Sequence, residues 1–465
     1  MIFHSLAYLV FLAVVLLLYW TLPRRGQNVL IVGASYVFYG WWHPWFLLPL
    51  WASTLVDYGC ALGMERFPAR RRAFLLVSIG TSVALLASFK YAGFALENLN
   101  ALVASLGREP WQTAWQIALP AGLSFYTFQS IGYTVDVYTG RVRAERNLLD
   151  YALYVSFFPQ LVAGPIERAG HMLPQYRAKR TFDPAGWRAA LRLGLWGFFK
   201  KLVIADNAAV VADKVFALTD PSFPVLWAGV FAFAVQIYAD FSGYTDIARG
   251  TARLLGIDLM ENFHHPYLAR SPADFWRRWH ISLSSWLRDF VYIPLGGNRG
   301  GTARASCNLL ATFTLSGLWH GASWNYVLWG VYWGLLILAQ RGLAFLGVTR
   351  LLPTAGKIAL TFAATCVGWL LFRERNLAQL VHDLTLPVWA TDARQWQTAA
   401  YLAALTLFYA LPLVVQTALT ARGGFAWPRS AGLSFALEVS VGTGLLLGIV
   451  AVRSVASADF IYFQF

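Results

Sequence analysis

The stretch LLATFTLSGLWHGASWNYVLWGVYWGLLILA, residues 309–339, decides the fold of this chain. It is almost wholly apolar, but it is longer than the roughly 20 residues that a helix needs to cross a membrane. Gly317, Gly321 and Asn325 predict a break in the stretch, beside its one histidine, His320. His320 is twelve residues beyond Asn308, so at about 1.5 Å per helical residue we expect it roughly 18 Å into the membrane, near its middle.

Other apolar stretches recur along the chain, and no polar segment of domain size separates them. They lie near residues 6–18, 28–40, 46–63, 74–95, 113–138, 190–210, 225–247, 355–372, 397–418 and 432–452. We therefore expect an all-α, polytopic transmembrane protein of about ten to twelve helices, forming one integral domain over residues 1–465. Pro and Gly interrupt residues 119–122 and 163–165, which predicts broken or re-entrant helices buried in protein or beside a wet cavity.

The composition excludes a soluble enzyme. Hydrophobic residues make up 58% of the 465 positions and charged residues 13%, against about 25% charged in soluble domains. The mean hydropathy is +0.51. The chain also holds 21 Trp, 21 Tyr and 33 Phe, an aromatic load typical of membrane interfaces. We find no internal repeat, which argues against a transporter built from inverted halves.

The net charge of +14 comes from 37 Lys and Arg against 23 Asp and Glu. The cations cluster in short segments at residues 65–72, 141–146, 168–188, 200–201 and 270–299. By the positive-inside rule these loops face the cytoplasm. The first apolar stretch lacks a preceding Lys or Arg and is followed by Arg24 and Arg25, so we expect it to remain as a span with the N-terminus outside. Topology and anionic lipid explain the cations, so no nucleic-acid partner is expected.

The three cysteines, Cys60, Cys307 and Cys366, lie far apart and form no pair with the spacing of metal ligands. We expect structural thiols, with neither a disulfide framework nor a metal site.

Residues 261–301, ENFHHPYLARSPADFWRRWHISLSSWLRDFVYIPLGGNRGG, are too polar to span a membrane and too rich in Trp for an ordinary loop. We expect them at the cytoplasmic interface. On a helix, His280 would sit at the edge of an apolar stripe formed by Trp276, Trp279, Leu283, Trp286, Leu287 and Phe290. Arg277, Arg278, Ser285 and Arg288 would face away. The glycine tract at 296–301, with Asn298 and Arg299, is either a backbone nest for an anion or a flexible turn.

Two histidines and two carboxylates are candidate functional groups. His320 is an ionisable residue at membrane depth, where such groups usually face a pathway, and burial favours a neutral imidazole that can accept a proton. The alternative for His320 or His280 is a structural histidine hydrogen-bonded to a neighbour. Asp240 and Asp246 lie at the end of another apolar helix, where they would orient a histidine, bind a charged donor, or pair with loop arginines.

Seven segments together resemble the membrane-bound O-acyltransferase family, and within it the bacterial alginate O-acetyltransferase branch. They are FYTFQSIGYTVDVY at 125–138, the Gly-Pro pair at 164–165, residues 240–246, ENF at 261–263, residues 275–301, LWHG at 318–321 and FIYFQF at 460–465. The likeness covers most of the chain, and the order of its motifs is highly specific.

The resemblance implies a fold with a central funnel, a catalytic core at about residues 120–345 and an acyltransferase of the bacterial inner membrane with a periplasmic N-terminus. The buried histidine of the family falls on His320 and its second histidine on His280. The implied donor is acetyl-CoA, and no metal is implied. The implied acceptor is an exported polysaccharide, reached directly or through a periplasmic SGNH-like acetyltransferase or esterase partner. Related proteins act on alginate, cellulose or peptidoglycan, and the acceptor of this chain stays open.

These implications lead to a mechanistic hypothesis. Coenzyme A carries several negative charges and is too costly to move through the membrane, whereas the acetyl group can pass. Basic residues such as Arg277, Arg278 and Arg299, with Asn298, would hold the donor, and His320 would act as general base. Asn325 or the Trp319 indole would stabilise the oxyanion, and His280 would position the thioester or shuttle the proton.

Two further classes of protein fit parts of the pattern. Broken helices and intramembrane histidines also suit a proton-coupled transporter, and a structural membrane subunit would need no chemistry. Cleavage of labelled acetyl-CoA favours the enzyme, movement of the intact donor favours the transporter, and neither outcome favours the structural subunit.

Overall fold

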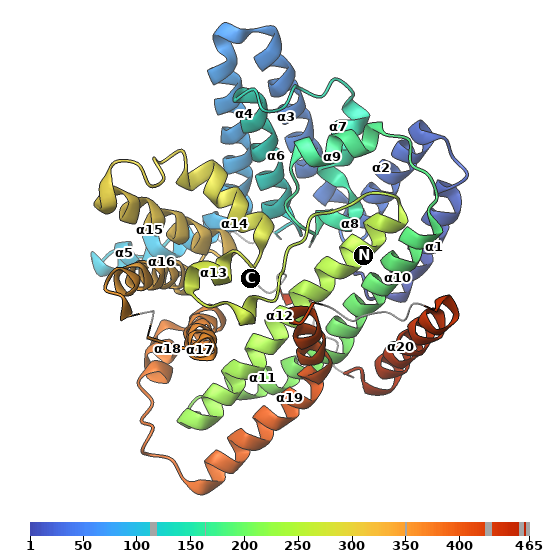
Figure 1. Ribbon diagram of the computed structural model, residues 1–465. Helices are drawn as coiled ribbons and strands as arrows, with labels where there is room; N and C mark the ends of the chain where they lie inside the picture. Colours follow the sequence, from blue (N-terminus) through green and yellow to red (C-terminus); the bar gives the residue numbers. More distant parts are fainter. Residues whose placement is uncertain (112–118, 163, 349–350, 424–429, 455–459, 462–465) are drawn as a thin grey trace.

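The computed structural model describes residues 1–111, 119–162, 164–348, 351–423, 430–454 and 460–461, and within them every regular element is a helix (Figure 1). The predicted all-α fold is confirmed. Seven described helices are long and apolar enough to cross a membrane: Pro44–Arg66, Pro68–Ser105, Phe223–Leu254, Trp324–Phe345, Thr354–Arg373, Ala393–Ala421 and Gly432–Val452. Shorter helices form the other predicted apolar stretches, so this is a multi-pass membrane protein.

The first half of the chain contains nine helices in its described part. They are α1 (Leu6–Tyr19), α2 (Arg24–Gly40), α3 (Leu47–Arg66), α4 (Arg71–Leu86), α5 (Ala92–Ser105), α6 (Leu123–Tyr138), α7 (Leu148–Ser156), α8 (Phe158–Leu161) and α9 (Ala169–Arg177). The predicted stretch at 74–95 forms the end of α4, the π-turn Ala87–Tyr91 and the start of α5.

The second half begins with α10 (Pro184–Phe199), the π-turn Lys200–Ala205, α11 (Asp206–Phe216) and α12 (Phe223–Leu254). The short helices α13 (Pro272–Trp276) and α14 (Ile281–Leu287) follow, with the π-turn Arg288–Tyr292. The remaining helices are α15 (Gly301–His320), α16 (Trp324–Phe345), α17 (Thr354–Arg373), α18 (Leu377–Leu384), α19 (Ala393–Ala421) and α20 (Ala431–Val452).

Helix α12 forms the centre of the molecule. It packs against α10, α11, α17 and α19, and Figure 1 shows it crossing the middle of the fold. Most of its side chains are buried because it is apolar around nearly its whole circumference, the pattern of a helix enclosed by others. The chain end returns to this helix, since the Phe460 ring lies 4.1 Å from that of Tyr244.

The predicted break in the 309–339 stretch is confirmed. Helix α15 ends at His320, Gly321 is extended, and α16 starts at Trp324. The two helices pack closely because glycines lie between them: a Cβ added at Gly330 would collide with the backbone oxygen of Phe313. Small residues allow this close approach between membrane helices.

The prediction of one continuous helix for the Trp-rich stripe was wrong. His280 adopts the left-handed conformation, with φ of 44°, and separates α13 from α14. The cause is a long-range interaction, because the backbone of Asn262 accepts the Ile281 N–H at 3.0 Å. The stripe side chains are still enclosed: Trp276, Trp279, Leu283, Trp286 and Leu287 are buried, and Phe290 is partly buried.

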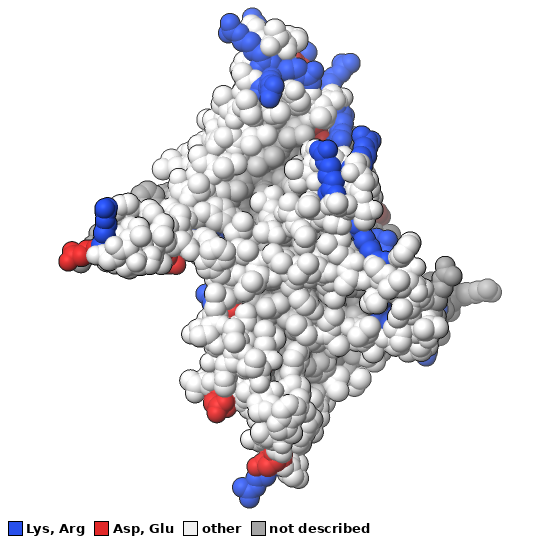
Figure 2. All heavy atoms as spheres, turned by 90° about the vertical axis from the view of Figure 1, so that its left-hand side faces the viewer, with Lys and Arg blue, Asp and Glu red and all other residues white. Residues whose placement is uncertain are grey.

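Basic side chains gather at one end of the molecule. Figure 2 shows Lys and Arg over the tip that joins α3 to α4, above a broad band without charge. Arg66, Arg70, Arg71 and Arg72 of this tip are exposed, which agrees with the predicted basic loop at 65–72.

Some predicted features lie outside the described residues. These are residues 113–118 of the 113–138 stretch, residue 163 of the 163–165 break, and residues 462–465 of the closing motif.

We expect Gly330→Ala to lower the free energy of unfolding by about 1–3 kcal/mol, since the added methyl group must push α15 and α16 apart. Thermal unfolding of the purified protein in detergent measures the effect. Gly342→Ala on the same helix is the matched control, because nothing lies within 4 Å of the added Cβ. Equal stability of the two variants would contradict the close packing of α15 and α16.

Candidate active site

Two histidines that lie 40 positions apart in sequence meet at one indole. The Trp319 ring lies 4.9 Å from the His320 ring and 5.9 Å from the His280 ring. His280 is 0% exposed and His320 is 4% exposed. The structure therefore brings the two predicted catalytic residues together in the protein interior.

The imidazole of His320 is enclosed by aromatic edges. Trp329 of α16 and Phe372 of α17 have ring centroids 4.9 and 5.3 Å from it. Rings from two other helices therefore surround His320 in the described part of the chain. A cavity of about 170 Å³ between α14 and α15 extends from Arg288 to Ser316, which lies one helical turn before His320.

His280 is held in a defined state by Asn262. The Asn262 Oδ1 atom accepts the Ser282 N–H at 3.1 Å and the Ser282 hydroxyl at 2.9 Å, so this side-chain atom is the carbonyl oxygen. His280 Nδ1 lies 3.2 Å from the same oxygen and must carry a proton to bond with it. A neutral His280 then has its lone pair on Nε2. Asn262 belongs to the ENF motif, but its role toward His280 was not predicted from the sequence.

The end of α15 is capped by two side chains that the sequence analysis missed. Lys90 Nζ donates to the carbonyl oxygens of Trp319 at 2.5 Å and His320 at 3.0 Å, and the Tyr91 hydroxyl donates to Leu318 at 2.8 Å. The last carbonyls of a helix have no partner within it, and a cation stabilises this negative end. Lys90 is the lone lysine in the apolar stretch 74–95, and that isolated charge could have suggested a buried role for it.

Trp319 also presents a polar atom to the site. Its indole nitrogen is a buried donor without a hydrogen-bond acceptor among the described residues. A donor in this state beside two histidines suits an oxygen that develops negative charge. Asn325 is less well placed, because its Nδ2 donates to the carbonyls of Leu371 and Phe372 at 3.3 and 3.4 Å.

The two candidate carboxylates pair with buried lysines of the second π-turn, not with loop arginines. Lys201 lies 2.9 Å from both Asp206 and Asp240, and Asp240 also accepts the Ile461 N–H at 2.7 Å. Lys200 lies 2.7 Å from Asp246. Asp240 is thus enclosed within the α10–α12 core.

Asp246 lines a cavity of about 130 Å³ with a mostly polar wall. Lys200, Arg249, Glu261 and Asn262 line the same cavity, and Asn262 connects it to His280. Of the two carboxylates, Asp246 is therefore the one that a polar group of a substrate could reach.

The predicted donor-binding residues lie at or near the protein surface. Arg277 is 73% exposed, and Arg278 Nε lies 3.1 Å from Asp274. Asn298 and Arg299 are exposed on the turn before α15.

The glycine tract at 296–301 begins with a turn in which three N–H groups are already bonded. The N–H groups of Gly296, Gly297 and Arg299 bond to backbone carbonyls of residues 292–296. Those donors are therefore not available to an anion.

Glu167 anchors the segment that carries Asn262. One of its oxygens accepts the Met260 N–H, and the other accepts from His171 Nδ1 at 2.8 Å. This hydrogen bond to Glu167 raises the pKa of His171. The ion pair therefore contributes to the support of the Asn262–His280 contact from α9.

Comparison with known proteins gives consistent matches. The family model described as MBOAT, membrane-bound O-acyltransferase family, matches residues 142–377. A probable alginate O-acetylase AlgI of Pseudomonas putida is 43% identical over 384 residues, covering 81% of this chain and 78% of that protein. Its counterpart in Pseudomonas aeruginosa is 42% identical over 381 residues, covering 81% and 73%. A peptidoglycan O-acetyltransferase of Helicobacter pylori is 36% identical over 408 residues, covering 79% and 76%.

We expect thermal stability to fall as the pH rises through the folded-state pKa of His171. The raised pKa means that the stabilisation is complete below the unfolded value of about 6.5 and is lost above the folded value. Unfolding midpoints between about pH 5.5 and pH 8.5 measure this loss. His171→Gln is expected to flatten that part of the profile, and an unchanged profile in this variant would contradict the assignment.

Proposed function

This chain belongs to the membrane-bound O-acyltransferase family and is an O-acyltransferase, and we propose that it transfers an acetyl group from cytoplasmic acetyl-CoA across the bacterial inner membrane for the O-acetylation of an exported polysaccharide. The single observation that carries the proposal is the meeting of His280 and His320 at Trp319, inside a bundle of membrane helices. The names of the relatives favour acetyl as the acyl group and an alginate-type polymer as the acceptor.

The charge distribution supports donor entry from the cytoplasm. The basic end of the molecule faces that compartment by the positive-inside rule, which puts the N-terminus in the periplasm. Exposed cations such as Arg277 and Arg299 raise the local concentration of the anionic donor. The donor stays on this side because several charges cannot enter the membrane interior at acceptable cost.

The chemistry requires one base and one oxyanion donor. His320 accepts the proton of the attacking hydroxyl as the hydroxyl oxygen bonds to the thioester carbon. The Trp319 N–H donates to the oxygen of the tetrahedral intermediate. The carbon–sulfur bond then breaks, and the imidazolium returns its proton to the leaving thiolate. His280, with its lone pair on Nε2, positions the thioester or relays this proton.

The proposal includes a conformational step that gives substrates access to the buried His320. The α14–α15 cavity approaches His320 from the end formed by Arg288 and Tyr292, and Trp276 forms part of its wall. Trp276 contacts Trp329, which contacts His320, with ring centroids 5.5 and 4.9 Å apart. Rotation of these two indoles would extend the cavity to the histidine.

The acceptor polymer has two candidates, an alginate-type polysaccharide and peptidoglycan, and the acetyl group could reach either through a partner protein. A periplasmic SGNH-like acetyltransferase or esterase partner would take the acetyl group on a serine and pass it to the polysaccharide. Peptidoglycan is the second candidate polymer, since the Helicobacter pylori relative is 36% identical over most of both chains. Mass analysis of surface glycans from a deletion strain distinguishes them.

We expect His320→Gln to lower acetyl-CoA cleavage by purified protein by about 10²–10⁴-fold, the usual contribution of a general base. Release of free thiol, in the presence of an acceptor, is the measurement. His264→Gln, an exposed histidine change, serves as control and should retain the native rate. Native cleavage by folded His320→Gln protein would exclude the base role, and passage of intact labelled donor would favour a transporter.

We expect Lys90→Met to lower kcat by about 10- to 100-fold, because hydrogen bonds to a charged group are worth roughly 1.5–3 kcal/mol. The KM for acetyl-CoA should change little, since Lys90 contacts the backbone that carries His320 and not the basic surface. Lys90→Arg should recover part of kcat, and the exposed Lys179→Met is the control. Native kcat per folded Lys90→Met molecule would refute this positioning role.

A further inference from the structure

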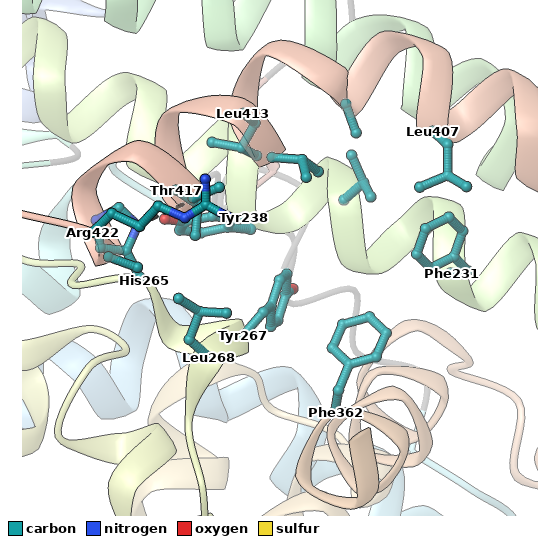
Figure 3. A pocket seen from close by; sticks show the side chains of 15 residues that line it. Phe231, Tyr238, His265, Tyr267, Leu268, Phe362, Leu407, Leu413, Thr417 and Arg422 are labelled. Carbon is teal, nitrogen blue, oxygen red and sulfur yellow. Dashed lines mark hydrogen bonds between the residues drawn. The ribbon is translucent and has the colours of Figure 1, made fainter. Parts of the chain in front are cut away.

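A large apolar groove lies between α12, α17 and α19. Helices α12, α17 and α19 and the turn Pro266–Leu268 surround a cavity of about 430 Å³ (Figure 3). Small-molecule sites commonly have volumes of about 300–1,000 Å³. The apolar wall includes Phe231, Val235, Phe362, Leu407, Leu413 and Val414. The three helices are all candidate membrane spans, so the groove between them lies at the depth of the hydrocarbon region.

The groove is polar at one end only. Figure 3 shows His265, Thr417 and Arg422 gathered there, while Phe231, Leu407 and Phe362 lie at the other end. His265 Nδ1 lies 3.3 Å from the Thr417 hydroxyl. Arg422 directly follows the last residue of α19. The lining therefore has the polarity of an amphipathic molecule that lies along it.

The positive charge at the polar end of the groove comes from Arg422. Burial lowers the pKa of His265, and the nearby His264, Arg278 and Lys200 lower it further. Arg278 and Lys200 have carboxylate partners in Asp274 and Asp246. Arg422 joins no ion pair within the part of the chain that the structure describes. An anionic group at this end would complement it.

The backbone at His265 is also unusual. His265 and His280 are the two non-glycine residues with positive φ among those described, and His265 has φ of 45°. Such conformations cost free energy and cluster at ligand and active sites. Here the turn directs the imidazole to Thr417 at the mouth of the groove.

We propose that the groove binds one glycerophospholipid with an anionic headgroup. Its phosphate lies against Arg422, Thr417 and His265, and one acyl chain lies along Phe231, Leu407 and Phe362. The charged headgroup then contacts the polar end of the groove, and the acyl chain contacts its apolar wall. The proposal concerns binding and does not depend on the proposed reaction.

A bound lipid would support the wall behind His280. Tyr238 and Tyr267 line the groove, and their rings lie 6.1 and 6.3 Å from that of Trp279, the residue before His280. The Tyr267 hydroxyl is fixed, since it donates to the Ala234 carbonyl at 2.6 Å. Occupancy is therefore expected to raise thermal stability as well as to be detectable directly.

Native mass spectrometry of the full chain in detergent tests the proposal, with phosphatidylglycerol, phosphatidylethanolamine and glycerol 3-phosphate as probes. We expect phosphatidylglycerol to bind about tenfold more tightly than phosphatidylethanolamine. Arg422→Gln should remove that preference, and Ala418→Trp, which fills the groove, should remove binding of both lipids. The matched control is Arg394→Gln, an exposed arginine at the other end of α19.

The remaining outcomes overturn the proposal. Equal binding of the two lipids, or equal preference in Arg422→Gln and Arg394→Gln, would refute headgroup recognition. Binding of glycerol 3-phosphate as tight as that of the lipid would indicate a free phosphate site. Lipid-independent dimers that Ala418→Trp abolishes would assign the groove to a second copy. Size exclusion and thermal unfolding verify that each variant is folded.

Discussion

The constraint on which the rest depends is the interruption of backbone hydrogen bonding at the end of α15, inside the membrane bundle. Carbonyls released there have no water to bond, and leaving them unsatisfied costs several kcal/mol. Lys90 and Tyr91 meet this cost from another helix, and their donors reach the carbonyls of Leu318, Trp319 and His320. His320 therefore lies at the point where Lys90 and Tyr91 allow α15 to end.

The same reasoning explains why the second histidine lies on an irregular segment. A regular helix from residue 272 to residue 290 would continue past His280 without the left-handed turn. Asn262 interrupts it by accepting from Ser282 and bonding to His280, and Glu167 anchors the segment before Asn262 by accepting the Met260 N–H. The positions of His280 and His320 therefore depend on side chains that are distant in sequence.

Local patterns predicted much of the fold. Composition, apolar stretches and the Gly-flanked break identified the helical membrane class and the end of α15 correctly, because these depend on neighbouring residues. The α13–α14 break was missed because Asn262 acts over 18 to 20 positions, and the Lys90 cap was missed because its acceptors lie about 230 positions away. The aromatic surroundings of His320 include rings from α16 and α17, which no local sequence pattern could predict.

The π-turn Ala87–Tyr91 gives this arrangement a particular sensitivity to chain length. A π-turn holds one residue more than the α-helical turn it replaces, and each residue rotates a helix by about 100°. Removing a single residue there would restore a regular α-helix and would turn the Lys90 ammonium group away from the end of α15. In this part of the protein, an insertion or deletion changes the direction in which Lys90 and Tyr91 point around the helix axis, even if both residues are retained.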